Sequence, residues 1–140
     1  MSDRPFCVHR LTVRFRDCDL MGHVNNAVYF TYLEQARLDW WRRLGGILTD
    51  AGATMILARA ECDYRAPAFL DDQLDIRVAA GTIGRTSFVL EYEIVNAASG
   101  LRIAQARTVS VSVDPQTHRP IPVPEAWRAM ITGSAASAAP

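Results

Sequence analysis

One short segment, residues 15–30, holds the side chains best suited to chemistry, and it reads FRDCDLMGHVNNAVYF. The carboxylates of Asp17 and Asp19 and the imidazole of His23 can accept protons, and a carboxylate can also attack a carbonyl carbon. The segment runs into a predicted helix, whose free N–H groups at its start can stabilise a negative charge developing on oxygen. A base beside an oxyanion site is what hydrolysis of an acyl group requires.

Spacing alone leaves each of these residues a structural role as well. A loop aspartate organises a turn or favours the helix end electrostatically, and nothing in the pattern singles out Asp17 as reactive. Asn25 and Asn26 precede the helix, where asparagine side chains accept hydrogen bonds from the first free N–H groups. His23 can brace the loop through its ring instead of acting as a base.

A long apolar helix is predicted over residues 27–44, ended by Gly45 and Gly46. Apolar residues recur in it at a period near 3.6 and share one face. This face comprises Tyr29, Leu33, Ala36, Trp40 and Leu44. Three further aromatic residues widen the apolar arc, so a sheet should cover the helix on more than one side: Phe30, Tyr32 and Trp41.

Alternating apolar and polar residues predict one strand before this helix and four after it. The strands fall at residues 8–15, 55–65, 74–78, 87–95 and 101–113. In the last of them the apolar residues change from even to odd positions, which predicts a β-bulge near Arg107. A short helix is predicted at residues 122–131, and residues 133–140 form a small-residue tail expected to be disordered.

The order β-α-β-β-β-β indicates a single α+β domain over residues 1–132, with an antiparallel sheet curled around a central helix. An open α+β sandwich with the helix on one face fits the same order. With 140 residues, 49% of them hydrophobic, the chain can bury one core without disulfides or metals.

Composition argues against several classes of protein. The 15 basic and 15 acidic residues balance, so no net field attracts nucleic acid or a membrane surface. Residues 1–10 lack the apolar stretch of a secretory signal, which favours a cytoplasmic location. No glycine-rich phosphate loop appears, and neither the cysteines nor the histidines have metal-ligand spacing, so no metal or cofactor is expected. These residues are Cys7, Cys18, Cys62, His9, His23 and His118.

Residues 15–30 resemble the signature of the 4-hydroxybenzoyl-CoA thioesterase group of hotdog proteins, in which an aspartate precedes a glycine and then an HVNN-like turn that opens the central helix. Tyr64, Pro67 and Asp72 resemble the family's tyrosine, proline and aspartate between its second and third strands, and GRTSF at residues 84–88 resembles its next hairpin. The resemblance spans roughly residues 8–131 and implies the hotdog fold.

The resemblance also assigns roles within the segment. It places the family's catalytic aspartate on Asp19 and its oxyanion amide on the backbone N–H of Asn26. In the related plant-type acyl-carrier-protein thioesterases, a histidine at the place of His23 works with an aspartate and an asparagine. Met21 stands where that asparagine would be, so His23 is a second candidate base, with bracing of the loop as its alternative.

Two helix residues and one asparagine have competing roles. Tyr29 is a candidate substrate contact, or a core residue whose hydroxyl reaches a partner. Asn25 is a candidate substrate contact, or a cap. Another hotdog branch has its catalytic carboxylate on the central helix, but Glu34 is predicted to form an ordinary ion pair with Arg37 three residues later.

The implied function is hydrolysis of an acyl-CoA thioester to a free acid and CoA, with Asp19 as the nucleophile or as the base that activates water. Arg85 is a candidate contact for the CoA phosphates, or an exposed solvated charge. An acyl-acyl-carrier-protein thioesterase and a non-catalytic acyl-CoA-binding hotdog protein are the alternatives. An exposed sheet edge and an incompletely covered helix predict a homodimer with a shared site, and the family implies that dimers often pair into homotetramers.

Overall fold

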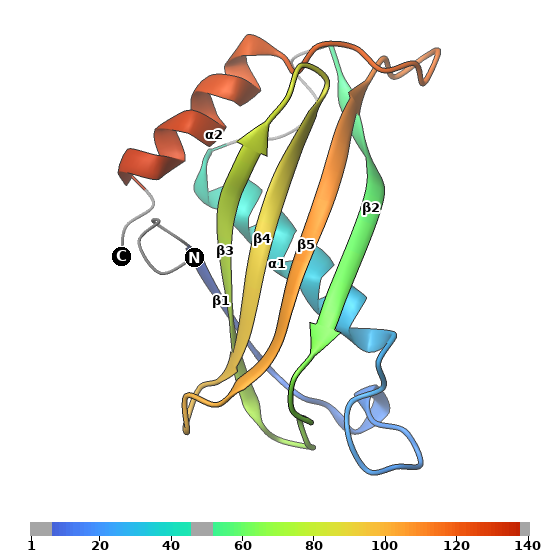
Figure 1. Cartoon of the computed structure of the whole chain (residues 1–140), viewed down its shortest axis with the longest axis vertical. Helices are drawn as coiled ribbons and strands as arrows, with labels where there is room; N and C mark the ends of the chain where they lie inside the picture. Colours follow the sequence, from blue (N-terminus) through green and yellow to red (C-terminus); the bar gives the residue numbers. More distant parts are fainter. Residues whose placement is uncertain (1–6, 46–51, 138–140) are drawn as a thin grey trace.

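An antiparallel sheet of five strands forms most of the computed structural model, which describes residues 7–45 and 52–137. In chain order the elements are β1 (Cys7–Thr12), the 3₁₀ turn η1 (Phe15–Asp17), α1 (Val28–Arg43), β2 (Thr54–Tyr64), β3 (Gln73–Ile83), β4 (Ser87–Asn96), β5 (Arg102–Val113) and α2 (Glu125–Ser137) (Figure 1). The strand order across the sheet is β1-β3-β4-β5-β2, so β1 and β2 are the edges.

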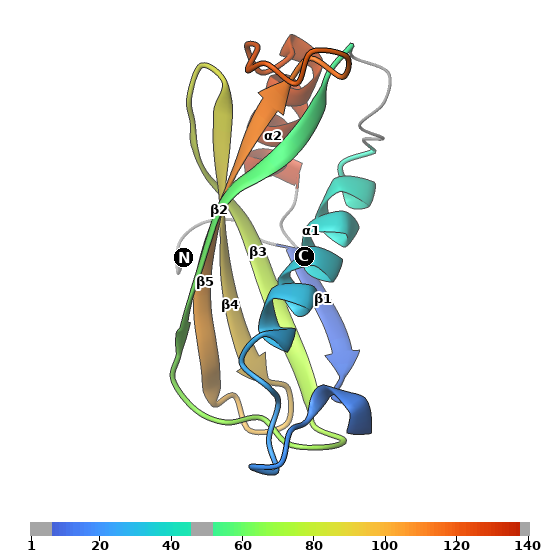
Figure 2. The ribbon, with the colours of Figure 1, turned by 90° about the vertical axis from the view of Figure 1, so that its right-hand side faces the viewer.

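The sheet curves around α1, which packs against one of its faces (Figure 2). The buried residues of α1 include Tyr29, Leu33, Ala36 and Trp40, the face predicted from their spacing, and the aromatic arc extends it through Tyr32 and Trp41. The predicted helix, the five-stranded antiparallel sheet and the hotdog arrangement are therefore confirmed. Within the described residues, no helix has the length and apolarity needed to cross a membrane.

The first strand is shorter than predicted. β1 ends at Thr12, and Phe15 begins η1 with 82% of its surface exposed, where a half-buried strand was expected to continue. Val13 is tied to the β2–β3 loop, because its N–H donates to the Asp72 oxygen and its carbonyl accepts from the Asp71 N–H. These two bonds end the regular pairing and start the loop that leads to the candidate site.

The predicted bulge near Arg107 is wrong. The irregularities in the pairing of β5 lie elsewhere, with Ala58 as the extra residue in β2 and Ile103 as the extra residue in β5. Even-numbered residues face α1 through the second half of β5 and include the buried polar residues Thr108, Ser110 and Ser112. The valines between them lie on the other face, so the alternation does not reverse near Arg107.

The C-terminal helix is longer than predicted. α2 runs on to Ser137, past the predicted helix end at residue 131. The disordered tail expected from residue 133 stays a prediction, and residues 138–140 and Gly46 lie outside the described residues. Alanine has the highest intrinsic helix propensity, and it offsets the cost of about 1 kcal/mol for Gly133 within a helix. The Trp127 ring meets the Trp41 ring at 5.7 Å, so α2 closes the end of the core farther from the candidate site.

Candidate active site

A small hairpin carries Asp19 beside the start of α1. Cys18 bridges to Val24, the Asp19 N–H donates to the His23 oxygen at 3.1 Å, and the Gly22 N–H donates back to the Asp19 oxygen at 3.0 Å. Gly22 has a φ of +88°, a conformation that glycine adopts without strain. Four residues after Val24 the chain enters α1 at Val28, so the fold sets Asp19 and the first turn of α1 close together.

Asp17 anchors the start of this hairpin, and its side chain is only 3% exposed. Its carboxylate accepts hydrogen bonds from the Arg14 N–H at 3.0 Å, the Arg14 guanidinium at 3.0 Å and the Tyr32 hydroxyl of α1 at 2.7 Å. Burial alone would raise the pKa of Asp17, but these donors and the Arg14 charge outweigh it and lower the pKa. Asp17 is therefore a fully bonded structural carboxylate.

Asp19 is partly exposed and has fewer partners. One of its oxygens accepts the Met21 N–H at 2.9 Å, and the other is 3.4 Å from the Asn25 side-chain nitrogen. Asp19 thus organises the turn, as a loop aspartate can, while its carboxylate also lines a cleft. The two roles are compatible, because a carboxylate pair of oxygens has about four acceptor positions.

The start of α1 supplies a free donor next to Asp19. The Asn25 side-chain oxygen accepts the Ala27 N–H at 2.9 Å, so Asn25 braces the backbone of the N-cap residue two positions later, while its contact with substrate stays a prediction. The helix's own N-cap residue, Ala27, has no side-chain bond. Among the hydrogen bonds within the described residues, none uses the N–H of Asn26. That N–H belongs to a residue lining the same cleft as Asp19.

The cleft has a volume of about 440 Å³ and is formed by the hairpin, the start of α1 and the end of β2. Its lining residues are Asp19, His23, Val24, Asn26, Tyr29, Tyr64, Arg65, Ala66 and Pro67. Burial raises the pKa of Tyr29 to about 12, so its hydroxyl stays protonated at neutral pH. His23 lies 3.2 Å through Nδ1 from the Val24 oxygen, which only accepts, so that nitrogen carries the proton in this arrangement.

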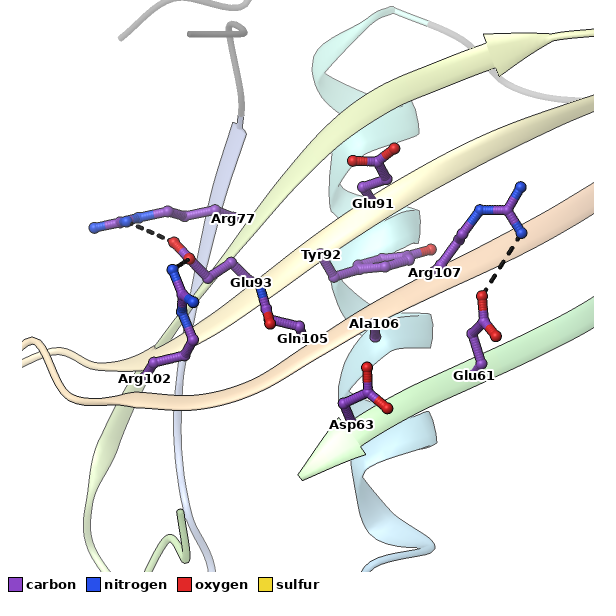
Figure 3. Close-up of a pocket in the computed structure, with 10 residues that line it drawn as sticks. All are labelled: Glu61, Asp63, Arg77, Glu91, Tyr92, Glu93, Arg102, Gln105, Ala106 and Arg107. Carbon is purple, nitrogen blue, oxygen red and sulfur yellow. Dashed lines mark hydrogen bonds and ion pairs between the residues drawn. The ribbon is translucent and has the colours of Figure 1, made fainter. Parts of the chain in front are cut away.

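A larger hollow of about 670 Å³ lies on the face of the sheet turned away from α1 (Figure 3). Its side chains are largely satisfied by one another: Glu93 lies 2.8 Å from both Arg77 and Arg102, and Arg107 lies 3.7 Å from Glu61. An array of paired charges offers no reactive group. The smaller cleft, which is lined by the partly exposed Asp19 and by Asn26, is the better candidate for chemistry.

A family model described as the thioesterase-like superfamily matches residues 13–131. The chain belongs to this superfamily. The match confirms the resemblance seen in residues 15–30 and covers the hairpin, α1, the four following strands and most of α2.

Proteins with named activities resemble most of the chain. The acyl-CoA thioester hydrolase YbgC of Escherichia coli O6:H1 is 31% identical over 116 residues, covering 81% of this chain and 86% of YbgC. The 1,4-dihydroxy-2-naphthoyl-CoA hydrolase of Synechococcus elongatus is 29% identical over 134 residues, covering 89% and 92%. The structure of Slr0204, a 1,4-dihydroxy-2-naphthoyl-CoA thioesterase from Synechocystis, has a TM-score of 0.84 at 23% identity, covering 91% and 96%, which shows a shared fold.

Two predictions made for this thioesterase-superfamily chain do not match the geometry of one protomer. Arg85 is exposed in the β3–β4 hairpin beside α2, at the end of the sheet opposite the cleft (Figure 1). Glu34 is exposed and does not pair with Arg37 as predicted; instead the Arg37 guanidinium donates to the Tyr92 hydroxyl at 3.2 Å. Arg37 lies at the edge of the buried face of α1, so its guanidinium is closer to the sheet than to the solvent-facing Glu34.

Sequence reasoning gave no role to Tyr64 and Arg65, which line the cleft from the end of β2. The family resemblance includes Tyr64 but assigns it no task. The Ala66-Pro67 pair could have indicated them, because a proline ends a strand and so places Tyr64 and Arg65 at the strand's end. Tyr64 and Arg65 come close to Asp19 only in the folded chain, and the spacing of residues in the sequence does not reveal this.

Replacing Asp17 with Asn should lower the free energy of unfolding by about 2–3 kcal/mol at pH 7, because charge-assisted bonds in a buried site are lost. Since folding lowers the pKa of Asp17 below its ordinary 3.8, its stabilisation is complete above that value and is lost as pH falls through the lowered pKa. Urea unfolding from pH 7 to pH 3 measures this. Asp63→Asn, at an exposed carboxylate, is the control, and a loss for Asp17→Asn that is independent of pH would contradict the electrostatic explanation.

Proposed function

We propose that this chain hydrolyses acyl-CoA thioesters, with Asp19 as the reacting carboxylate and the N–H of Asn26 as the oxyanion donor. The observation that carries the proposal is that a partly bonded carboxylate and a backbone N–H without an acceptor line one cleft at the start of α1. The names of YbgC and of the naphthoyl-CoA hydrolase support a CoA thioester as the substrate.

The reaction can follow two routes in this site. In one, an Asp19 oxygen attacks the thioester carbon, the C–S bond breaks, the CoA thiolate leaves and takes up a proton, and water then hydrolyses the mixed anhydride. In the other, Asp19 accepts a proton from a water that attacks the same carbon. In both routes the carbonyl oxygen becomes negatively charged, and the Asn26 N–H stabilises it.

His23 is the second candidate base. With the proton on Nδ1 held toward the Val24 oxygen, the other ring nitrogen of the neutral imidazole is an acceptor. It could then receive a proton from water or return one to the leaving thiolate. Met21 cannot replace the asparagine of the related triad, since its thioether is only a weak acceptor and its side chain is 78% exposed.

Substrate contacts are proposed at three places. Tyr29 lines the cleft through its ring, and Asn25 lies against Asp19, so both are placed to contact the acyl end of the substrate. Arg65 lies at the rim of the cleft and is exposed, which suits a CoA phosphate. Arg85 keeps this role only as a prediction, because one protomer places it at the far end of the sheet.

A homodimer formed through the open edge of β2 is also proposed. β2 pairs with β5 on one side, and its start carries the exposed apolar residues Ile56 and Leu57. An unpaired edge with apolar side chains favours pairing with a second copy. Antiparallel pairing around a twofold axis would bring these residues toward the partner's cleft. Pairing of two such dimers into a homotetramer and a cytoplasmic location remain predictions from the sequence.

Replacing Asp19 with Asn should reduce kcat for thiol release from acyl-CoAs by at least about 100-fold, because Asn neither attacks the carbonyl nor accepts a proton from water. The unfolding free energy should change little, since Asn still accepts the Met21 N–H. Asp63→Asn is the matched control. A panel of short, long and aromatic acyl-CoAs, with thiol release followed by absorbance, measures the effect. Turnover of Asp19→Asn equal to that of the wild type would reject Asp19 as the reacting carboxylate, and a wild type that releases no thiol from any of them would reject the proposed function.

Replacing Leu57 with Lys should convert the dimer to a monomer, because the charge would be buried against the partner's edge strand. The control is Leu101→Lys, at an exposed leucine in the turn between β4 and β5, which should leave the dimer intact. Sedimentation velocity gives the masses, including any tetramer. A wild-type protein that sediments as a monomer, or a Leu57→Lys variant of unchanged mass, would argue against this interface.

A further inference from the structure

We infer that Tyr64 is a positioning residue of the proposed active site, whose hydroxyl fixes the backbone that presents the oxyanion-binding N–H of Asn26. The inference rests on the proposed function, because it gives Tyr64 a part in the same reaction. Tyr64 ends β2, and its hydroxyl donates to the carbonyl oxygen of Asn26 at 2.9 Å across 38 residues of chain. This bond joins the edge of the sheet to the start of α1.

The bonded carbonyl belongs to the peptide group between Asn26 and Ala27. The N–H of that same group donates to the Asn25 side-chain oxygen at 2.9 Å. Because a peptide group is planar, the two bonds hold one rigid plane at both of its polar ends. The N–H of Asn26 lies on the other side of its Cα, so fixing this plane removes one of the rotations that would let the N–H turn away from the cleft.

Tyr64 is 46% exposed, and its ring packs against one neighbouring ring. It meets the Tyr29 ring edge-on, with centroids 5.3 Å apart and planes at 63°, and it lines the cleft. Burial raises the pKa of Tyr64, so the hydroxyl remains a donor through the neutral range. The ring contact therefore orients the Tyr64 hydroxyl, and the hydrogen bond from this hydroxyl orients the peptide group after Asn26.

This bond affects the transition state more than the bound substrate. An oxyanion donor accelerates a reaction when it already points to where the charge develops. A donor that must first reorient loses part of that advantage, whereas the acyl and CoA parts of the substrate bind through other contacts. Loss of the Tyr64 hydroxyl should therefore lower kcat and leave KM almost unchanged.

The test compares Tyr64→Phe with the wild type in thiol release from an acyl-CoA. Losing one hydrogen bond that orients the donor should reduce kcat several-fold to about tenfold, with KM within about twofold. Tyr92→Phe is the matched control: it removes a hydroxyl bonded to Thr108 and Arg37 far from the cleft, so it should lower the melting temperature and leave kcat unchanged. The opposite pattern in the two variants separates positioning from stability.

A second variant and a second readout strengthen the test. Tyr64→Leu should lose as much kcat as Tyr64→Phe and also raise KM, because the ring lines the cleft. Amide hydrogen exchange of Ala27 should speed up in both variants, since the peptide that they release carries this N–H.

A wild-type kcat in Tyr64→Phe or Tyr64→Leu, or a rise in KM alone for Tyr64→Phe, overturns the positioning role. Asp19→Asn in the same assay separates this failure from that of the proposed function. If Asp19→Asn is inactive while Tyr64→Phe turns over normally, the role of Tyr64 alone is rejected. If Asp19→Asn is fully active, Asp19 is not the reacting carboxylate, and the role of Tyr64 in that site fails with it. A wild-type protein that releases no thiol from any acyl-CoA would reject the proposed hydrolysis itself.

Discussion

The buried carboxylate of Asp17 is the contact on which the geometry of the candidate site depends. It binds the backbone and guanidinium of Arg14 and the hydroxyl of Tyr32 on α1, while the Asn25 N–H donates to the Asp17 backbone oxygen. The two ends of the small hairpin are thus tied to each other and to the helix. A carboxylate stays ionised in such a site because donors surround it. Its position then determines where the next aspartate of the pair lies.

The two aspartates, separated by one residue, have different surroundings. Asp17 is buried, and its carboxylate accepts hydrogen bonds from Arg14 and Tyr32. Asp19 is partly exposed, and its carboxylate has one short and one long hydrogen bond. Different surroundings commonly give two neighbouring carboxylates different tasks. Here the division follows from which side of the hairpin each residue faces, and the helix start completes the second environment with a backbone donor.

The sequence predicted those parts of the fold whose signal is local. The period of the apolar residues placed the helix within one residue of its observed ends at Val28 and Arg43. The alternation of apolar residues gave the wrong inward face in β5. There Thr108 and Ser112 face the core and valines face outward, because small residues of either polarity fit in the space beneath a helix. The turn of Arg37 toward Tyr92 and the bond from Tyr64 to Asn26 are contacts between distant segments, so no local pattern reveals them.

The charged outer face of the sheet has a consequence for how the strands align. Across β2, β5 and β4, Glu61, Arg107 and Glu91 lie directly opposite one another, and Arg77 of β3 lies opposite Glu93. Sliding β5 by a single residue would move Arg107 to the inner face, against α1 and away from both carboxylates. The small residues beneath the helix would discriminate poorly against such a slip. The charges on the outside therefore favour the observed alignment, together with the buried hydrogen bond between Tyr92 and Thr108.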